Sequence, residues 1–173
     1  RYEVKSAWRE ERLDFGLEGK SVVVTAASKG LGMATALEFA REGANVLIAS
    51  RNEERLRLAV TEIRQQCGHD RVRYIVCDLR KPEDIQAMIH EAIDWNGTVD
   101  VLVNNAGGPP AGSFEQFSDQ DWEQAFHLNL LSYVRTVREV LPYMKRQRDG
   151  KIIQFASSSV KEVLDDLILS NTL

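Results

Sequence analysis

The stretch Ser21-Val22-Val23-Val24-Thr25-Ala26-Ala27-Ser28-Lys29-Gly30-Leu31-Gly32 joins a run of β-branched apolar residues directly to a glycine-containing turn. The run is short and almost wholly apolar, which is typical of a strand buried on both faces of a parallel sheet. Residues from Leu31 to Arg41 then repeat apolar side chains at helical spacing and stop before Gly43. A strand, a tight turn and a helix N-terminus therefore follow one another here, an arrangement that presents backbone N–H groups to an anion.

The same alternation continues along the chain. Further strands are predicted at residues 45–49, 72–76, 99–103 and 151–155, and helices at 53–66, from 82 to about 93, and from 118 to about 144. Five buried strands alternating with helices predict a doubly wound α/β fold. Right-handed crossovers then predict a Rossmann-type parallel sheet with the strand order 3-2-1-4-5. Residues 1–19 are interpreted as a charged lead-in, and residues 20–173 as the nucleotide-binding domain.

The composition of the 173-residue chain bounds its partners. Apolar residues make up 43% of it and charged residues 28%, which is ordinary for a globular protein. The net charge of −4 argues against nucleic acid as the main partner, because phosphate contacts need a basic surface. No apolar run approaches the roughly 20 residues that a membrane helix needs, and residues 1–11 lack the apolar region of a signal peptide. We therefore expect neither a nucleic-acid nor a membrane partner.

Cysteine and histidine usage predicts a cytoplasmic protein without a metal site. Cys67 and Cys77 are too few for a disulfide framework, which indicates reduced thiols. The three histidines are scattered and show no metal-ligand spacing. The chain begins with Arg1 rather than methionine and ends at Leu173 within a helical pattern, so we expect it to be part of a longer protein.

Five motifs lie along the predicted elements: the turn from Thr25 to Gly32, Asp78-Leu79, Asn104-Asn105-Ala106-Gly107, Asn129 in a Leu-Asn-Leu setting, and Ser157 at the end of the fifth strand. The short-chain dehydrogenase/reductase family has such motifs in the same order, and over about residues 14–160 the chain resembles that family. The turn resembles the family loop Thr-Gly-x-x-x-Gly-x-Gly, except at Ala26. The resemblance implies a nicotinamide cofactor, catalytic roles for Asn129 and Ser157, and a homo-oligomer.

The loops that follow the strands are expected to bind the cofactor. The residues concerned are Thr25, Ala27, Ser28, Lys29, Gly30, Leu31, Gly32, Ser50, Arg51, Asn52, Asp78, Leu79, Asn105, Ala106 and Gly107. The second strand ends in Ser50-Arg51-Asn52 and lacks the acidic residue that would hold the ribose hydroxyls of NAD(H). Arg51 can instead grip a 2′-phosphate, with Lys29 as a second cation and Ser50 and Asn52 as neutral donors. The sequence therefore predicts NADP(H) in preference to NAD(H).

The chain departs from the family at two places. Ala26 replaces the first loop glycine, and its methyl group would be strained if the turn needs a positive φ. Counting from Ser157, the position of the family's proton-donating tyrosine falls on Ser170, and that of its lysine lies one residue past Leu173. Tyr133 and Tyr143 precede this region and are interpreted as packing residues.

Three explanations of the missing tyrosine stay open. The loop after Ser157 differs in length and a tyrosine lies further on, or Ser170 acts with a basic residue beyond it, or the protein binds nucleotide without catalysis. We favour the second, which makes Ser157, Asn129 and Ser170 the candidate catalytic residues. A serine hydroxyl is a far poorer acid than a phenol, so Ser170 is expected to donate a hydrogen bond rather than to act as the tyrosine does.

The predicted function is an NADP(H)-dependent oxidoreductase that interconverts a small-molecule carbonyl and an alcohol. The resemblance points to 3-oxoacyl-carrier-protein reductases and to sugar or alcohol dehydrogenases. A non-catalytic nucleotide-binding protein of the same fold is the main alternative, and a methyltransferase is a weaker one. We also expect the fifth strand to leave an exposed sheet edge that needs a partner or a cover.

Overall fold

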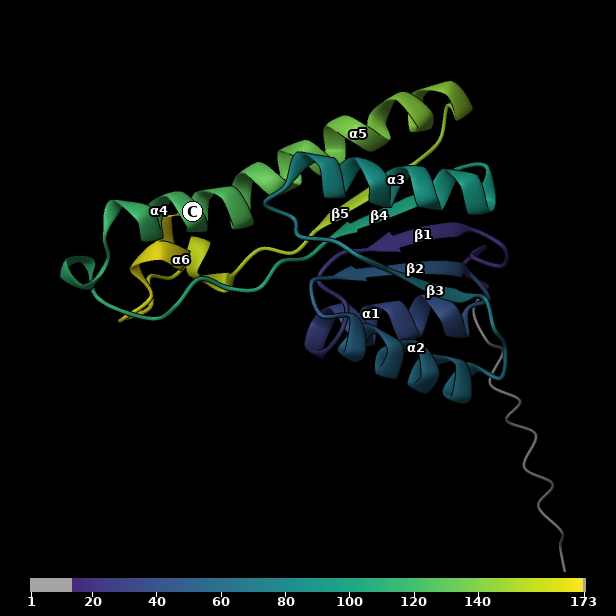
Figure 1. The fold of residues 1–173 in the computed structure, drawn as a ribbon, viewed down its shortest axis with the longest axis horizontal. Helices are drawn as coiled ribbons and strands as arrows, with labels where there is room; N and C mark the ends of the chain where they lie inside the picture. The colour runs from purple at the N-terminus through teal and green to yellow at the C-terminus, as the bar shows by residue number, and fades with distance from the viewer. Residues whose placement is uncertain (1–13, 173) are drawn as a thin grey trace, which may run out of the picture.

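The computed structural model describes residues 14–172, which fold around a five-stranded parallel sheet (Figure 1). The strands are β1 (Ser21–Val24), β2 (Asn45–Ser50), β3 (Val72–Val76), β4 (Val101–Asn104) and β5 (Lys151–Gln154). Their order is β3-β2-β1-β4-β5, so the predicted order is confirmed. The strand order reverses between β1 and β4, and at such a switch point the connections leave the sheet on opposite faces.

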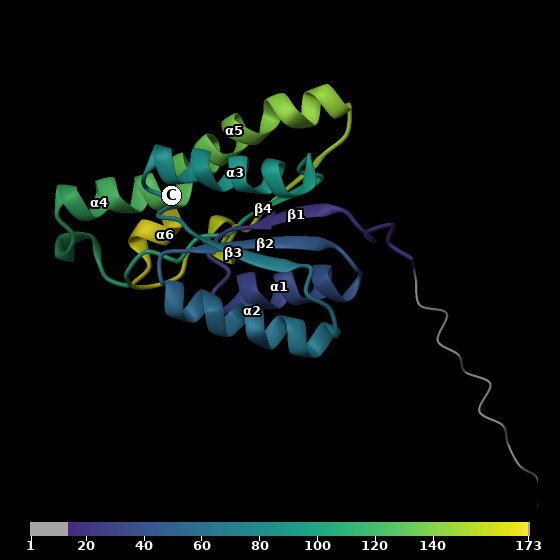
Figure 2. The same cartoon turned by 45° about the vertical axis from the view of Figure 1, so that its right-hand side comes forward.

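Helices cover both faces of the sheet. Figures 1 and 2 show α1 (Gly30–Arg41) and α2 (Glu53–Cys67) on one face, and α3 (Pro82–Asn96) and α5 (Ser132–Gln147) on the other. Successive residues of a strand point to opposite faces. Val22 and Val24 accordingly pack toward α1 and α2, while Val23 packs toward α3 and α5. Burial on both faces is the reason why the central strands read as continuous apolar runs.

The helix boundaries follow from local capping chemistry. Asn52 caps α2 by accepting a hydrogen bond from the Arg55 backbone N–H at 2.8 Å. Pro82 occupies the first turn of α3, where its missing N–H costs nothing. Ser118 and Asp121 form the predicted capping box at the start of α4 (Asp119–Phe126).

The single long helix predicted from Ser118 to about Met144 is wrong in one respect. The structure divides it into α4, a π-helical turn η2 (His127–Leu131) and α5. Within η2 the Asn129 side chain donates from Nδ2 to the Ala125 carbonyl at 3.1 Å. Apolar spacing is nearly the same in a π-turn and an α-turn over so few residues, so the sequence pattern could not reveal it. Such turns are frequent at functional sites.

Two helices lie beyond the carboxyl ends of the strands. Figure 1 shows α4 and the short helix α6 (Ile168–Thr172) beyond these ends, on the side to which the arrows point. The 107–117 loop, which contains the 3-10 turn η1 (Phe114–Gln116), is joined to this region because the Gly112 N–H donates to the Asp166 carbonyl at 2.6 Å. A second 3-10 turn, η3 (Ser158–Val160), follows β5.

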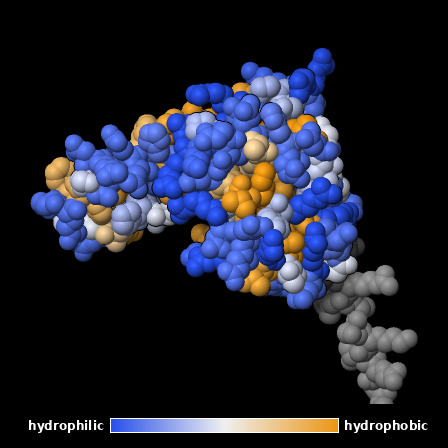
Figure 3. All heavy atoms as spheres, viewed as in Figure 1, coloured by the Kyte–Doolittle hydropathy of each residue, from blue (hydrophilic) through white to orange (hydrophobic). Residues whose placement is uncertain are grey.

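The surface in the view of Figure 3 is mostly hydrophilic, with hydrophobic residues showing mainly in the middle of the main body. At the sheet edge, β5 pairs with β4 and is exposed along its length, with Ile152 37% and Ile153 40% exposed. The expected uncovered edge is thus present in the part of the chain that the structure describes. No helix within residues 14–172 combines the length and apolarity that crossing a membrane requires.

The predicted lead-in falls mostly outside the described residues. Of its expected turns, Gly16 and Gly19 are described and have φ values of 64° and 72°, in the left-handed region that glycine adopts freely.

Candidate functional site

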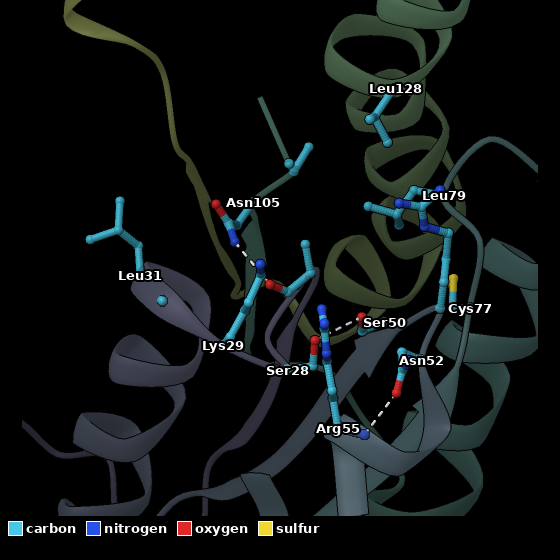
Figure 4. Close-up of a pocket in the computed structure, with 15 residues that line it drawn as sticks. Ser28, Lys29, Leu31, Ser50, Asn52, Arg55, Cys77, Leu79, Asn105 and Leu128 are labelled. Carbon is cyan, nitrogen blue, oxygen red and sulfur yellow. Dashed lines mark hydrogen bonds between the residues drawn. The ribbon is translucent and has the colours of Figure 1, made fainter. Parts of the chain in front are cut away.

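A cavity of about 930 Å³ lies at the carboxyl ends of β1, β2, β3 and β4 (Figure 4). Open α/β sheets bind their ligands at this edge, at the point where the strand order reverses. The predicted cofactor-binding residues that line the cavity are Ser28, Lys29, Gly30, Leu31, Ser50, Arg51, Asn52, Leu79, Asn105, Ala106 and Gly107. Residues from four separate loops that the sequence predicts to bind the cofactor thus lie around one cavity.

Three of the predicted cofactor-binding residues, Thr25, Ala27 and Gly32, lie beneath the cavity and are buried. The Thr25 hydroxyl donates to the Asn105 carbonyl at 2.6 Å and accepts from the Asn105 N–H at 2.8 Å. The Ala27 N–H donates to the Ala49 carbonyl at 3.1 Å. These residues hold the turn against β2 and β4 and do not face the cavity.

At Gly32 the turn and α1 are in close contact. A Cβ built there would lie 2.7 Å from Asn105 Nδ2, 2.8 Å from the Ala26 carbonyl oxygen and 2.9 Å from the Ala27 Cα. Real Cβ atoms do not approach other atoms so closely, so only glycine fits. This close packing seats the helix N-terminus directly under the cavity, as a phosphate-binding turn requires.

Ala26 occupies the strained position that the sequence raised as a possibility. Its φ is 47°, which costs an alanine on the order of 1–2 kcal/mol relative to a right-handed conformation. Its carbonyl accepts from Asn105 Nδ2 at 3.3 Å, so the strained conformation is held by the loop after β4.

Ala26→Gly is expected to raise the free energy of unfolding by about 0.5–1 kcal/mol, because glycine relieves the positive φ at a modest entropic cost in the unfolded chain. Thermal melts of the two chains measure the change. Ala27→Gly is the matched control, since Ala27 is absent from the positive-φ residues and glycine there should destabilise. A lower melting temperature for Ala26→Gly would contradict the strain.

Three cations stand around the end of β2: Lys29, Arg51 and Arg55. Arg55 is a lining residue that the sequence analysis missed, although its spacing of four from Arg51 was a usable signal. The Ser28 and Ser50 hydroxyls lie 3.0 Å apart and form the floor between these cations (Figure 4). Among the described residues that line the cavity, none carries a carboxylate.

Asn52 and Asp78 have narrower roles than the sequence suggested. The Asn52 side-chain oxygen is engaged in capping α2, which leaves its Nδ2 as the available donor. Asp78 is not among the residues that line the cavity, and its carboxylate receives hydrogen bonds from Arg80 Nε at 2.9 Å and Nη2 at 2.6 Å. The Arg80 side chain accordingly holds the pKa of Asp78 below its usual range. Leu79, beside it, does line the cavity.

A second cavity of about 680 Å³ brings the three predicted catalytic residues together. Asn129, Ser157 and Ser170 all line it, and they come from η2, the segment between β5 and η3, and α6. Leu31, Asn105 and Ala106 line both cavities, so the two adjoin.

The hydroxyls of Ser157 and Ser170 are joined through Ser159, a buried residue that the sequence analysis did not single out. Ser159 Oγ lies 2.8 Å from Ser157 Oγ and 3.2 Å from Ser170 Oγ. The Ser159 side chain is only 3% exposed. The run of three serines from Ser157 was a visible signal, but nothing in it showed which hydroxyl turns inward.

Tyr133 is more than the packing residue that the sequence suggested. It lines the second cavity and donates its hydroxyl to the Phe155 carbonyl at 3.2 Å. Burial raises the pKa of Tyr133 to about 12. Within residues 14–172 no three His, Cys, Asp or Glu side chains gather as they would around a metal ion.

The profile of the short chain dehydrogenase family matches residues 20–165. The chain belongs to this family. An uncharacterized oxidoreductase of Staphylococcus saprophyticus is 36% identical over 141 residues, which are 82% of this chain and 56% of that protein. The chain spans little more than half the length of the curated relatives that it matches.

Solved structures of a reductase and a dehydrogenase share the fold. L-sorbose reductase from Gluconobacter frateurii, complexed with NADPH and L-sorbose, matches with a TM-score of 0.87 and 31% identity over 92% of this chain and 60% of that one. A 7α-hydroxysteroid dehydrogenase complexed with NADH and a 7-oxo bile acid matches with a TM-score of 0.84 and 30% identity over 90% of this chain and 60% of that one. A nicotinamide cofactor is therefore supported, and the two neighbours do not distinguish NADP from NAD.

Proposed function

We propose that the protein transfers hydride between NADP(H) and a small-molecule carbonyl or alcohol. The observation that carries the proposal is the pair of adjoining cavities. One presents a helix N-terminus and three cations, and the other presents the side chains of Asn129, Ser157 and Ser170. A dinucleotide laid across the first would direct its reactive end past Asn105 and Ala106 into the second.

NADP(H) is favoured over NAD(H) by the charges at the end of β2. Arg51 and Arg55 are exposed and Lys29 projects from the opposite wall, so a 2′-phosphate would meet cations from two sides. An NAD(H)-selective site would place a carboxylate here to accept from the ribose hydroxyls. The carboxylate of Asp78, at the end of β3, is bound by Arg80.

The residues of the second cavity fit a carbonyl oxygen. In this proposal Ser157 donates a hydrogen bond to that oxygen, and Asn129 lines the wall from η2. When bound, the nicotinamide supplies the hydride. Apolar residues that include Pro109 and Leu169 line other parts of the wall, which suits an apolar substituent beside the carbonyl.

The ligands of the solved neighbours support a substrate class. L-sorbose and a 7-oxo bile acid, the ligands of the two solved neighbours, both carry a ketone. We propose ketones of the 3-oxoacyl or sugar type for this chain.

The experiment that tests the function has two parts. Fluorescence titration with NADPH, NADH and S-adenosylmethionine measures binding, and NADPH oxidation is then followed with a panel of 3-oxoacyl esters, ketoses and cyclic ketones. We expect tighter binding of NADPH than of NADH and turnover of at least one ketone. NADPH binding without any turnover would favour a non-catalytic nucleotide-binding protein, and preference for S-adenosylmethionine would overturn the assignment.

A homo-oligomer is also part of the proposal. Phe126, Leu130 and Val134 are spaced four residues apart through η2, and each is 40–43% exposed. Such an apolar stripe on one side of a helix suits contact with a second copy. Light scattering compares the molar mass of the unchanged protein with that of Leu130→Glu. If both proteins have the mass of a monomer, the proposed contact is refuted.

The free state of the two cysteine thiols is the basis for proposing a cytoplasmic location. Cys67 and Cys77 are both free, and burial raises the pKa of Cys77 to about 12, so this thiol stays protonated and unreactive. Cell fractionation measures the location directly.

A further inference from the structure

The three serine hydroxyls beside the second cavity form a continuous chain whose middle member, Ser159, is buried. We propose that Ser159 is a positioning residue that turns the Ser157 proton into the cavity and, together with Ser170, resupplies that proton after each turnover. The inference rests on the proposed function and on the explanation in which Ser170 stands at the position of the family's tyrosine.

The direction of the Ser157 hydroxyl follows from counting its hydrogen bonds. A serine oxygen has two lone pairs and one proton. Ser157 Oγ accepts from the Ser159 N–H at 3.2 Å and from the Ser159 hydroxyl at 2.8 Å, which fills both lone pairs. Ser157 is exposed and lines the cavity. Its own proton is therefore left to point at whatever oxygen the cavity holds.

The direction of Ser170 follows in the same way. Ser159 has one proton, and the acceptor at the shorter distance is Ser157 Oγ at 2.8 Å, with the Ser170 carbonyl at 3.1 Å. Once that proton is given to Ser157, the 3.2 Å contact between Ser159 Oγ and Ser170 Oγ is a hydrogen bond only if Ser170 donates. The protons then run in one direction, from Ser170 through Ser159 to Ser157.

The chain balances the reaction in the direction of carbonyl reduction. A bound reduced nicotinamide would supply the hydride of the new C–H bond. The carbonyl oxygen, which gains the electron pair of the broken π-bond, takes the proton of Ser157. Ser157 takes the proton of Ser159, Ser159 takes that of Ser170, and Ser170, which lines the cavity, takes one from water, which leaves as hydroxide. The carbonyl is reduced, the cofactor that would supply the hydride is oxidised, and the three serines regain their starting state once their hydroxyls have rotated back.

A chain of hydroxyls compensates in part for the weak acidity of each one. Hydrogen bonds in series polarise one another, and the negative charge that develops on Ser157 is shared with the next two oxygens. The nearby phenol of Tyr133 is not arranged for this role, because its proton is donated to the Phe155 carbonyl.

The test compares Ser159→Ala with Ser158→Ala in the full chain. Ser158 is the exposed neighbour, and its side chain has no part in the hydroxyl chain. We expect Ser159→Ala to lower kcat by about 10- to 100-fold. We also expect KM to stay within about threefold and the NADPH dissociation constant to be unchanged. Ser158→Ala should behave as the unchanged protein, and Ser159→Thr, which keeps a hydroxyl, should recover most of kcat.

Solvent isotope effects give a readout that a merely structural role would not move. The rate of the unchanged protein in mixtures of H₂O and D₂O should follow a curved dependence on deuterium fraction, because several protons move together, and Ser159→Ala should make it linear. The unchanged protein alone is enough for this measurement if Ser159→Thr fails to fold. A linear dependence in the unchanged protein would overturn the relay.

The failures of the two proposals are distinguishable. An unchanged protein that binds NADPH and reduces no carbonyl refutes the proposed function, and the relay with it. An active protein in which Ser159→Ala matches Ser158→Ala refutes the relay alone. Loss of activity in Tyr133→Phe with full activity in Ser159→Ala would instead assign the proton to the phenol and would also refute the relay.

Discussion

Gly32→Ala is expected to weaken NADPH binding by at least about tenfold and to lower the free energy of unfolding by about 1–2 kcal/mol. The added Cβ would stand within 2.9 Å of three atoms, two of which belong to the backbone of the turn at Ala26 and Ala27. The turn must therefore move outward, into the space where a phosphate would lie. The third atom, Asn105 Nδ2, would be pushed off the carbonyls of Thr25 and Ala26 that it now bonds.

Two contributions of opposite sign determine the stability of Gly32→Ala. Alanine is favoured over glycine inside a helix by about 0.5–1 kcal/mol, which stabilises the variant. Overpacking typically costs about 1–3 kcal/mol, and here it falls on backbone atoms that have no rotamer to change. The net loss should lower the melting temperature by roughly 2–8 °C in a chain of this size.

Thermal melts and NADPH titrations of the same preparations measure both effects. Gly68→Ala is the control for a glycine replaced by alanine, because Gly68 caps the far end of α2 and has open space around its Cβ position. It should destabilise through its φ of 73° and leave NADPH binding unchanged. Unaltered binding in Gly32→Ala would show that the turn does not seat the cofactor.

The sheet and the first cavity were predictable from the sequence because they depend on strong local signals. Apolar runs too short for helices marked all five strands, and the expected cavity residues came from the ends of those strands. Parallel strands bring their carboxyl ends to one edge, so topology alone gathered residues as distant as Ser28 and Asn105.

The features that the sequence could not show depend on where side chains point rather than on where residues lie in the fold. Asp78 was expected at the cofactor, but Arg80 lies two residues on and binds its carboxylate. Ser159 follows Ser157 in an exposed-looking run, yet packing against α6 buries it between Ser157 and Ser170. A polar residue does not reveal in the sequence which neighbour takes its hydrogen bond.

Arg51→Glu is expected to change the ratio of NADPH to NADH affinity by about 100- to 1,000-fold in favour of NADH. A hydrogen bond between charged groups contributes about 1.5–3 kcal/mol, so losing the guanidinium costs NADPH roughly 10- to 100-fold. The new carboxylate would also repel the 2′-phosphate and accept from the ribose hydroxyls of NADH, which adds about a further tenfold. Lys29 and Arg55 remain in the cavity, and for that reason we expect NADPH binding to weaken rather than to vanish.

Titration of both cofactors at two ionic strengths measures the ratio and its electrostatic part. Arg138→Glu is the matched control, because it makes the same change in net charge on the exposed side of α5, away from the residues that line the cavity. If the two variants lose NADPH affinity equally, the effect comes from the overall charge and Arg51 does not touch the phosphate. If Arg51→Glu alone changes the ratio, and added salt reduces the difference, the end of β2 sets the cofactor preference.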